Sequence, residues 1–448
     1  MTILLIQLPT SHLGSNEIVY PVGLSRLSSV LKTRGAYFTA MDLNLYKDPW
    51  DTFKQALINT RPSAVGLSFR NLDPLGNNLT SYLSSLEIGA KLTKSLSNAL
   101  LIVGGPAFSL MPRQFMEKFL EIDIGIVGEG ELALAKLVES QWNPMGVPNV
   151  IYRSGDKLLL NRSGPHISMK EIPSLDLTNL SPLGYLGHNS YVAPMGIEGK
   201  RGCDLNCGYC VYPRIGGFRV RVRSPNLIVD EMELLNKEYG INLFHFTDPV
   251  LNKPTEHFEE IVREILKRRL KVGWTGFFRE DHVSESQIEM AKEAGLVTIY
   301  FSADGAYSKA LKLLNKHLTS ELLTRAYTFA ARSKILTVYH FFLDLPFETE
   351  EDREEMKNFI YKLVELHYPN KNLGGIVFSR IRLYPNTPLT TFLIRKNLVP
   401  SHINFLYPYY FSNHDNSYLM YELDSFTKQM SIFSLMGIDG VRNENLSP

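Results

Sequence analysis

The stretch Gly202-Cys203-Asp204-Leu205-Asn206-Cys207-Gly208-Tyr209-Cys210 contains every cysteine of this 448-residue chain. Three cysteines in so long a chain rule out a disulfide framework. Because all three lie within eight residues, in the spacing C-x3-C-x2-C, we expect them to share one chemical task.

Two kinds of metal centre suit three clustered thiolates. An iron–sulfur cubane needs three cysteines for three irons and leaves its fourth iron open. A structural zinc ion needs four ligands, as a rule in C-x2-C or Cys/His pairs, and no matching second pair occurs in the sequence. We therefore predict a [4Fe–4S] cluster on Cys203, Cys207 and Cys210, with zinc as the alternative.

Around and beyond the cysteines, over residues 190–394, apolar runs of strand length alternate with stretches of helical period. The predicted strands are Tyr191–Ile197, Leu243–Thr247, Val272–Phe277, Val297–Ser302, Thr337–Leu343 and Gly375–Arg380. Six such units predict a partial (β/α)6 barrel of TIM-like type, with an active site at the carboxyl ends of its strands. The cysteines follow the first strand and so belong to this mouth. For residues 395–448, rich in Tyr, Phe and Asn, we predict only a small C-terminal extension.

Residues 1–135 show a similar alternation of strands and helices, which predicts a flavodoxin-like (Rossmann-type) α/β domain with a parallel sheet. The expected strands are Ile3–Leu8, Tyr37–Leu43, Ala64–Phe69, Ala99–Val103 and Ile124–Val127. Residues 136–189 contain turn signals such as Ser154-Gly155, and we interpret them as a connector.

The cysteine motif, the aromatic Tyr209 and the βα series after it resemble the radical S-adenosylmethionine (SAM) superfamily, roughly from Ser190 to Leu389. This resemblance implies that the open iron binds SAM, which an electron from the cluster cleaves to a deoxyadenosyl radical. The segment Phe301–Gly305, followed by Asn315-Lys316, is similar to the family's fourth-strand segment, where Glu usually occupies the position of Asp304.

Two later segments extend the resemblance. Leu343–Thr349 resembles the family's Gly-Leu-Pro-Gly-Glu-Thr turn, with Asp344 and Phe347 in place of the glycines. We therefore expect this loop to avoid conformations that require glycine. Tyr384–Leu389 is similar to the family's Pro-Gly-Thr-Pro-Leu segment.

Several polar side chains near the predicted strand ends are candidate contacts of SAM or substrate. These are Tyr209, Asp248, Arg279 and Asp304. A polar lining of the mouth explains Asp248 equally well. Because side chains alternate along a strand, we also expect either Tyr339 or His340 to line the interior.

The N-terminal domain resembles the cobalamin-binding domain that precedes many radical SAM cores. The resemblance is carried by Val103-Gly104-Gly105-Pro106 and by Ile126–Glu131, in which small residues let the backbone approach a corrin. The implied cobalamin-binding residues are Arg70, Asn71, Gly104, Gly105, Pro106, Gly128, Glu129 and Gly130.

The lower face of the cobalt is a separate question. His12 lacks the Asp-x-His-x-x-Gly context of a cobalt ligand and is better explained as a solvated loop residue. In the tryptophan C2-methyltransferases, which this chain resembles, an arginine of the third-strand loop lies under the cobalt. Arg70 fits that part, and an ion pair with Asp73 explains it equally well.

Together these resemblances imply an enzyme with a [4Fe–4S] cluster, SAM and cobalamin as cofactors. We predict a methyltransferase that moves a methyl group from SAM through cobalamin to an unactivated carbon or phosphorus of a small-molecule substrate. The alternatives are a rearrangement, ring contraction or cyclisation with the same cofactors and, outside enzymes, a cobalamin or iron–sulfur sensor.

Composition bounds the partners. Forty-seven basic and 46 acidic side chains give a net charge of +1, which predicts neither nucleic acid nor an anionic membrane as a partner. The apolar start MTILLIQLP is too short for a membrane span and lacks a basic leader, so we expect a cytoplasmic protein. The predicted partners are a small-molecule substrate and an external low-potential electron donor.

Overall fold

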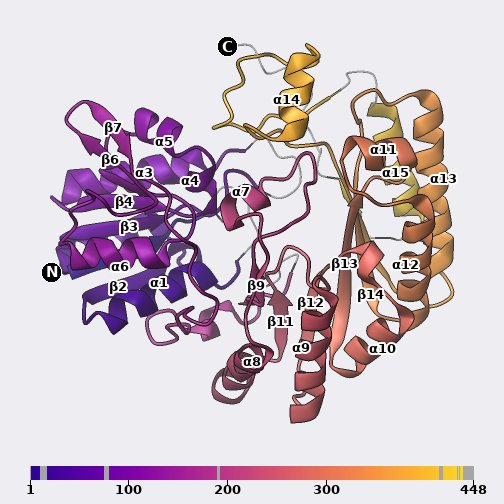
Figure 1. Ribbon diagram of the computed structural model, residues 1–448, viewed down its shortest axis with the longest axis horizontal. Coiled ribbons are helices and arrows are strands. Elements are labelled where there is room, and N and C mark those ends of the chain that lie inside the picture. Colours follow the sequence, from indigo (N-terminus) through magenta and orange to yellow (C-terminus); the bar gives the residue numbers. More distant parts are fainter. Residues whose placement is uncertain are drawn as a thin grey trace. The chain divides into compact units, whose positions relative to one another are not determined.

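The computed structural model describes residues 2–10, 18–74, 80–188, 192–412, 417–430, 432 and 434–436. The chain divides into two compact units. The N-terminal unit contains the described residues up to Gly196 together with Arg214–Gly217, and the C-terminal unit contains Ile197–Pro213 and the described residues from Phe218 onward. Each unit is built around its own sheet (Figure 1).

The N-terminal sheet has five parallel strands in the order β2-β1-β3-β4-β5, the flavodoxin-like order that the sequence predicts. They are β1 (Thr2–Gln7), β2 (Tyr37–Asp42), β3 (Ala64–Ser68), β4 (Leu100–Gly104) and β5 (Ile124–Ile126). Helices cover both faces, with α1 and α6 on one face and α2 and α3 on the other (Figure 1). The helices that lie wholly within this unit are α1 (Val22–Thr33), α2 (Pro49–Thr60), α3 (Leu83–Leu96), α4 (Pro106–Leu110), α5 (Pro112–Lys118) and α6 (Glu131–Glu139).

Residues 136–189, which we interpret as a connector, include a hairpin that the sequence analysis did not predict. There β6 (Val150–Ser154) and β7 (Lys157–Leu160) form an antiparallel hairpin that extends the same sheet beyond β5. The turn signal at Ser154-Gly155 is the hairpin turn, where Gly155 has a φ of +58°. The two strands have only five and four residues, so neither stands out from a loop by periodicity alone.

The C-terminal sheet is parallel and open, in the order β16-β15-β14-β13-β12-β11-β8. Its strands are β8 (Met195–Ile197), β11 (Leu243–Phe246), β12 (Gly273–Phe278), β13 (Leu296–Asp304), β14 (Leu336–Phe342), β15 (Leu373–Ser379) and β16 (Ser434–Met436). Its first and last strands do not pair in the described structure, which agrees with the expected incomplete barrel. Strand β16 lies in the stretch after residue 395 that the sequence left without a fold.

Helices follow the strands of this sheet and pack on one side of it (Figure 1). They are α8 (Pro225–Tyr239), α9 (Thr255–Arg268), α10 (Glu285–Glu293), α11 (Ser308–Leu313), α12 (Ser320–Ser333) and α13 (Glu350–His367), followed by α14 (Pro388–Arg395) and α15 (Ser417–Gln429). The start of α13 is fixed by a capping box, in which Thr349 and Asp352 bond to each other's backbone N–H groups. The short pair β9 (Lys200–Arg201) and β10 (Arg221–Val222), with α7 (Tyr212–Gly216) between them, flanks the cysteine stretch.

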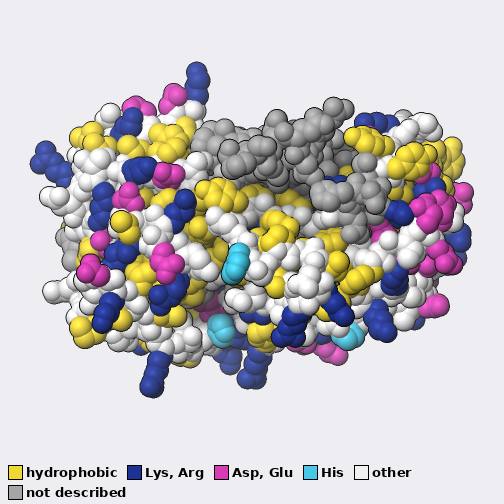
Figure 2. Space-filling model, turned by 90° about the horizontal axis from the view of Figure 1, so that it is seen from above, with side chains coloured by type: hydrophobic (Ala, Val, Ile, Leu, Met, Phe, Trp, Pro, Cys, Tyr) yellow, Lys and Arg dark blue, Asp and Glu magenta, His cyan; other side chains and the backbone are white. Residues whose placement is uncertain are grey.

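Two surface properties bear on the predicted partners. No helix in the described residues combines the length and apolar composition that a membrane span requires. On the face drawn in Figure 2, Lys and Arg side chains are interspersed with Asp and Glu side chains, in line with the near-zero net charge.

The loop from Leu343 to Thr349 departs from its prediction. Asp344 has a φ of +59° and Phe347 a φ of +64°, so both adopt the left-handed conformation that the replaced glycines favour. Aspartate is among the residues that tolerate this region, and the buried Asp344 carboxylate lies 3.2 Å from the Arg380 guanidinium. The expectation that this loop avoids such conformations is therefore wrong, because tertiary contacts hold it there.

Candidate active site

The three cysteines line one cavity of about 120 Å³ at the carboxyl ends of β11, β12 and β13. The cavity is lined by Cys203, Leu205, Cys207, Tyr209, Cys210, Tyr212, Pro249, Val250, Phe277, Phe278, Arg279, Glu280, Ser302 and Lys316. Among the described residues, no three His, Cys, Asp or Glu side chains converge on the position of one metal ion. Thiolates that ligate different irons of one cubane have no need to converge on a single point.

Two segments that resemble the radical SAM family in sequence hold the backbone of the cysteine loop. Gly208 donates its N–H to the carbonyl of Leu314 (2.8 Å), and its own carbonyl accepts the N–H of Leu389 (2.8 Å). The Asn315 side chain donates to the carbonyl of Asn206 (2.5 Å). The turn after α11 and the start of α14 therefore set the shape of the loop.

Burial changes the pKa of two of the cysteine thiols. It raises the pKa of Cys203 and raises that of Cys210 to about 12, while the Tyr212 N–H, 3.4 Å from the Cys210 sulfur, acts in the opposite direction. A buried thiolate needs a cation close by, and iron supplies that charge when it binds. Three clustered thiols in one cavity thus fit an iron–sulfur cluster.

Next to the cysteines lies a buried group made of Tyr209, Asp304 and Lys316. The Tyr209 hydroxyl donates to Asp304 Oδ2, and Lys316 Nζ donates to the same oxygen at 2.8 Å. The two charged side chains are 8% and 6% exposed. Burial by itself lowers the pKa of Lys316, but the Asp304 carboxylate and neighbouring anionic groups raise it above its ordinary value. The charge of Asp304 is thus compensated by Lys316 inside the protein, next to the cavity.

Lys316 is a site residue that the sequence analysis did not select. The Asn315-Lys316 pair was noted only as part of a resembling segment. Its buried ammonium, shared between the Asp304 carboxylate and the Ser302 carbonyl, is visible only in the fold.

Arg279 and Asp248 mainly contact other groups of the protein. Arg279 lines the cavity, but its guanidinium donates to the Lys316 carbonyl and lies 2.8 Å from Asp281. Asp248 is not among the lining residues, and its Oδ1 accepts the N–H groups of Gly199 (2.8 Å) and Lys200 (3.0 Å). Burial raises the pKa of Asp248 to about 6. The predicted contacts of these two residues with a cofactor remain predictions.

Lys200 is a second buried cation that the sequence did not mark. It is 2% exposed, and its ammonium donates to the carbonyls of Val250, Leu251 and Lys253 at 2.7–3.2 Å. Burial lowers its pKa against the pull of Asp248. The lysine therefore fixes the loop after β11, which forms one wall of the cysteine cavity.

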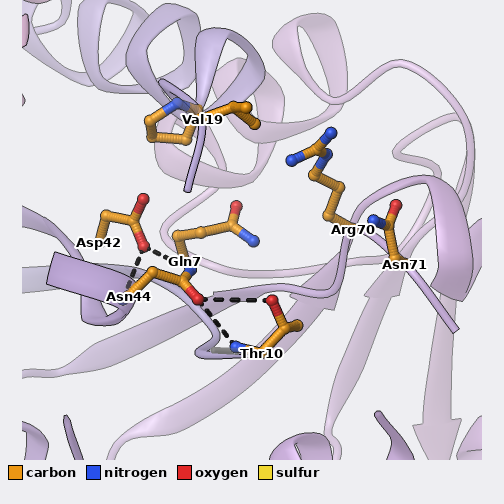
Figure 3. A pocket seen from close by; sticks show the side chains of 8 residues that line it. Gln7, Thr10, Val19, Asp42, Asn44, Arg70 and Asn71 are labelled. Atoms are coloured by element: carbon orange, nitrogen blue, oxygen red, sulfur yellow. Dashed lines mark hydrogen bonds between the residues drawn. The ribbon is translucent and has the colours of Figure 1, made fainter. Parts of the chain in front are cut away.

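The N-terminal unit has a small polar cavity of about 20 Å³ at the carboxyl ends of β1, β2 and β3 (Figure 3). It is lined by Gln7, Thr10, Val19, Pro21, Asp42, Asn44, Arg70 and Asn71. Asn44 holds the far side, since it donates to Asp42 (2.7 Å) and accepts the N–H of Thr10 (2.8 Å). Arg70 is exposed and extends into this space between Gln7 and Val19 (Figure 3).

Asp42 is the buried anion of this cavity. Burial raises its pKa, while bonds from Asn44 and the Tyr185 hydroxyl (2.8 Å) and the charge of Arg70 act in the opposite direction. A carboxylate of this kind holds a nearby guanidinium by its charge. Asp42 and Gln7 are therefore cavity residues that the sequence analysis missed, because nothing local distinguishes them from ordinary strand ends.

The glycine loops after β4 and β5 adjoin the Arg70 loop. Gly105 has a φ of +107°, and a Cβ on it would lie 2.5 Å from the carbonyl oxygen of Phe69, so only glycine fits. The N–H of Ala107, just after Pro106, points at the carbonyls of Phe69 and Arg70 (both 3.2 Å). The fold thus brings Gly104, Gly105 and Pro106 to the same edge as Arg70.

The loop after β5 is tied to the loop after β4 through Ser109, whose hydroxyl donates to the Gly105 carbonyl and accepts the Gly128 N–H. Glu129 instead turns to residues 166–167, where its carboxylate accepts the Ile167 N–H at 3.0 Å. Gly130 caps α6. His12 lies outside the described residues.

Both units match known families. Residues 15–138 match the B12 binding domain family, and residues 197–360 match the radical SAM superfamily. An uncharacterised methyltransferase of Pyrococcus horikoshii is 27% identical over 71% of this chain and 69% of its own length. The tryptophan 2-C-methyltransferase of Streptomyces laurentii is 23% identical over 78% of this chain and 68% of its own.

A third relative has a different activity. The anaerobic magnesium-protoporphyrin IX monomethyl ester cyclase of Cereibacter sphaeroides is 29% identical over 58% of this chain. This chain spans less than half of that cyclase, namely 44% of its length.

Two solved structures share the fold over most of the chain. The radical SAM methyltransferase TsrM of Kitasatospora setae, with cobalamin and a [4Fe–4S] cluster bound, has a TM-score of 0.72 at 22% identity and covers 88% of this chain and 78% of its own. The cobalamin-dependent SAM radical enzyme OxsB, with aqua-cobalamin and SAM bound, has a TM-score of 0.76 at 18% identity, with 96% and 66% covered.

The predicted α/β architecture and cofactor set are confirmed by these matches, since the radical SAM domain implies a [4Fe–4S] cluster and SAM, and the B12 binding domain implies cobalamin. The chain therefore belongs to the cobalamin-dependent radical SAM enzymes, the family that includes radical SAM methyltransferases.

Proposed function

We propose that this chain transfers a methyl group from SAM, by way of cobalamin, to an unactivated carbon or phosphorus atom of a small molecule. The observation that carries the proposal is the set of three cysteines lining one cavity at the strand ends, in a chain with a separate B12 binding domain. Methyltransferases among the relatives support methyl transfer as the outcome.

In this proposal Cys203, Cys207 and Cys210 hold the cluster, which supplies the electron for SAM cleavage. The protein's own side chains bind, orient and exclude water. Tyr209, Asp304 and Lys316 form a rigid wall beside the cysteine loop, because each is buried and bonded to another member. Arg279 and Asp248 fix the loops that frame the cavity through their backbone contacts.

In the N-terminal unit we propose that the loops after β3, β4 and β5 receive cobalamin, which serves as the methyl carrier. Gly104, Gly105, Gly128 and Gly130 keep their part of the surface free of side chains, and Pro106 adds only a compact ring. Arg70 and Asn71 offer polar groups from the small cavity, and Glu129 fixes the loop after β5. We assign these roles to residues 1–135, and those of the cluster and SAM to residues 190–394.

Cyclisation or rearrangement with the same cofactors is the second candidate. It is favoured by the similarity to a magnesium-protoporphyrin IX monomethyl ester cyclase. Either reaction requires an external low-potential electron donor, and we place both in the cytoplasm. An amino acid or natural product is the substrate class we favour, as tryptophan is for one relative.

The test is anaerobic reconstitution with iron, sulfide and hydroxocobalamin, followed by turnover of SAM with a low-potential reductant. We expect about four irons and one cobalamin per chain. S-adenosylhomocysteine with a product heavier by CH2 supports methyl transfer, whereas deoxyadenosine without a mass gain supports rearrangement. Zinc without iron contradicts the cluster and the whole proposal.

A further inference from the structure

The N-terminal sheet ends in strand β7, which has no further strand beside it in the described part of the chain (Figure 1). After Lys157, the strand consists of Leu158, Leu159 and Leu160. Leu159 is 41% exposed and Leu160 is 57% exposed. Proteins usually protect an open edge with proline, a bulge or charged side chains, and here the only such residue is Lys157 at the start of the strand. An apolar open edge of this kind favours pairing with another strand.

The backbone of β7 offers hydrogen-bonding groups at this edge. The Asn161 N–H donates to the Val150 carbonyl (2.9 Å), which fixes where the bonded pairs of the β6–β7 ladder fall. In an antiparallel ladder, pairs that exchange hydrogen bonds alternate with pairs that do not. Counting back along the register from Asn161, Leu159 bonds to β6, whereas Leu158 and Leu160 do not. The N–H and C=O groups of these two leucines therefore point away from β6, toward the open edge.

Two further exposed apolar side chains lie near the strand. Leu120 belongs to a turn whose carbonyls accept hydrogen bonds from the Arg153 side chain, and Arg153 lies opposite Leu158 in the hairpin. Met145 belongs to another turn, whose carbonyls accept hydrogen bonds from the Asn161 side chain. The apolar surface at the end of the sheet is therefore wider than the strand itself.

The sequence of this edge is complementary to itself. In an antiparallel pair of two such strands centred on Leu159, Leu158 lies opposite Leu160 of the partner subunit, so the outward backbone groups of both strands meet. The same register sets Asp156 opposite Arg162 of the partner subunit, on both sides of the two-fold axis. Both side chains are exposed, and neither forms an ion pair with another described residue. A parallel pair in register would instead oppose like charges.

We propose that two copies of this chain associate through β7, in an antiparallel pair centred on Leu159 that joins the two N-terminal sheets. Leu158 and Leu160 exchange backbone hydrogen bonds with the same residues of the partner subunit. Their side chains pack against one another across the two-fold axis. Asp156 and Arg162 form the flanking ion pairs. Such a contact is isologous, because the same surface of both subunits forms it, and it does not depend on the reaction that the chain catalyses.

The test is sedimentation velocity of the anaerobic holoenzyme at protein concentrations from about 1 µM to about 200 µM. We expect a reversible equilibrium of monomer and dimer with a dissociation constant on the order of 10 µM, because the strand is short and the contact lies at the small end of specific interfaces. The weight-average sedimentation coefficient should therefore rise with concentration.

A first variant tests whether β7 is the contact. Leu160→Lys places an ammonium group against the apolar side chain of Leu158 of the partner subunit, and it should weaken the dimer at least about tenfold. Leu234→Lys is the matched control, because Leu234 is 48% exposed but lies on α8 in the C-terminal unit. Its dissociation constant should stay within about twofold of the wild-type value.

Charge reversal tests the register. Asp156→Arg and Arg162→Asp each oppose like charges across the contact and should weaken the dimer about tenfold. The double variant restores opposite charges with the signs exchanged, so it should recover to within about threefold of the wild type. These side chains are exposed, so melting temperature and iron content should match the wild type. If one single variant does not fold, the double variant and Leu160→Lys still carry the comparison.

Three results would each overturn the inference. A holoenzyme that stays monomeric over the whole concentration range leaves β7 open to another partner or to none. A dimer that Leu160→Lys does not weaken uses a different surface. A double charge variant that stays as weak as the single variants contradicts the antiparallel register.

Discussion

At the scale of single residues, the cysteine cavity depends on charges that compensate each other out of water. Asp304 and Lys316 are both more than nine-tenths buried, and each is the other's charged partner. Removing either one leaves an uncompensated charge in a low-dielectric site, which costs far more than the pair itself contributes. The cysteines beside them also need a compensating charge, since their buried sulfurs favour the thiolate only with a cation present.

Asp304→Asn and Lys316→Met should each destabilise the holoenzyme by about 3 kcal/mol, whereas the double variant should lose clearly less than the sum. Melting temperatures of the four proteins form the test cycle. Additive losses would contradict a coupled pair. Lys309→Met, at a half-exposed lysine paired with Asp352, is the control and should cost about 0.5 kcal/mol.

Cys203→Ala, Cys207→Ala and Cys210→Ala should each abolish stable cluster binding, because only three thiolates are available to hold it. Iron and acid-labile sulfide per chain are the measurement. Asp204→Asn is the matched control, since this exposed carboxylate lies in the same loop and pairs with Lys253. A Cys207→Ala protein with full iron content would contradict the ligand set.

Glu280 makes stability fall as pH rises. Burial raises its pKa to about 7, above its ordinary value of 4.5, against the pull of Lys316. The folded state therefore keeps a proton that the unfolded state releases, so its contribution is complete below pH 4.5 and is lost as pH rises through about 7. Glu280→Gln should flatten the melting temperature between pH 5 and pH 8, and the exposed-site control Glu256→Gln should not. An unchanged slope in Glu280→Gln would assign the effect to other groups, such as Asp248 or Glu348, whose pKa values are also raised.

At the scale of elements, loops that follow parallel strands collect the site. The loops after β3 and β4 touch through Gly105, whose missing side chain lets the Phe69 carbonyl approach. In the C-terminal unit, the turn after α11 and the start of α14 hold the cysteine loop through backbone hydrogen bonds. Such contacts hold the loops that carry the candidate cofactor-binding residues in fixed positions at the ends of the strands.

Gly105→Ala should weaken cobalamin binding about tenfold and destabilise the protein by about 1–3 kcal/mol, because a Cβ there collides with backbone and the φ is unfavourable. Absorbance titration with hydroxocobalamin and the melting temperature are the measurements. Gly128→Ala is the matched control, with a φ of +79° but no atom within 4 Å of the added Cβ, and it should cost about 1 kcal/mol. Equal effects of the two variants would mean that backbone strain, not the close approach, decides.

At the scale of the whole molecule, each cofactor's candidate residues lie within one compact unit. The cysteines belong to the C-terminal unit, and Arg70 and the glycine loops belong to the N-terminal unit. Loading of the two cofactors should then be independent, although turnover needs both.

Cys203→Ala should therefore keep about one cobalamin per chain, and Gly105→Ala should keep its full iron content, while SAM-dependent methyl transfer falls by more than about tenfold in both. Cobalamin and iron quantification on the same preparations checks this. Loss of cobalamin in Cys203→Ala would show that the two sites are coupled.

The sequence by itself determined the parallel strands of each unit and the cysteine motif, because these follow from hydrophobic period and from the local spacing of residues. Short strands such as β6, β7 and β16 gain their stability from the sheet beside them, so no local pattern marks them. The same reason applies to Asp344 and Phe347, whose left-handed conformations are imposed by their surroundings. Only the tertiary structure decided that Asp304 pairs with Lys316, that Asp42 and Gln7 lie beside Arg70, and that His340, not Tyr339, faces the interior. Burial and pairing are properties of residues far apart in the chain, and the fold alone brings them together.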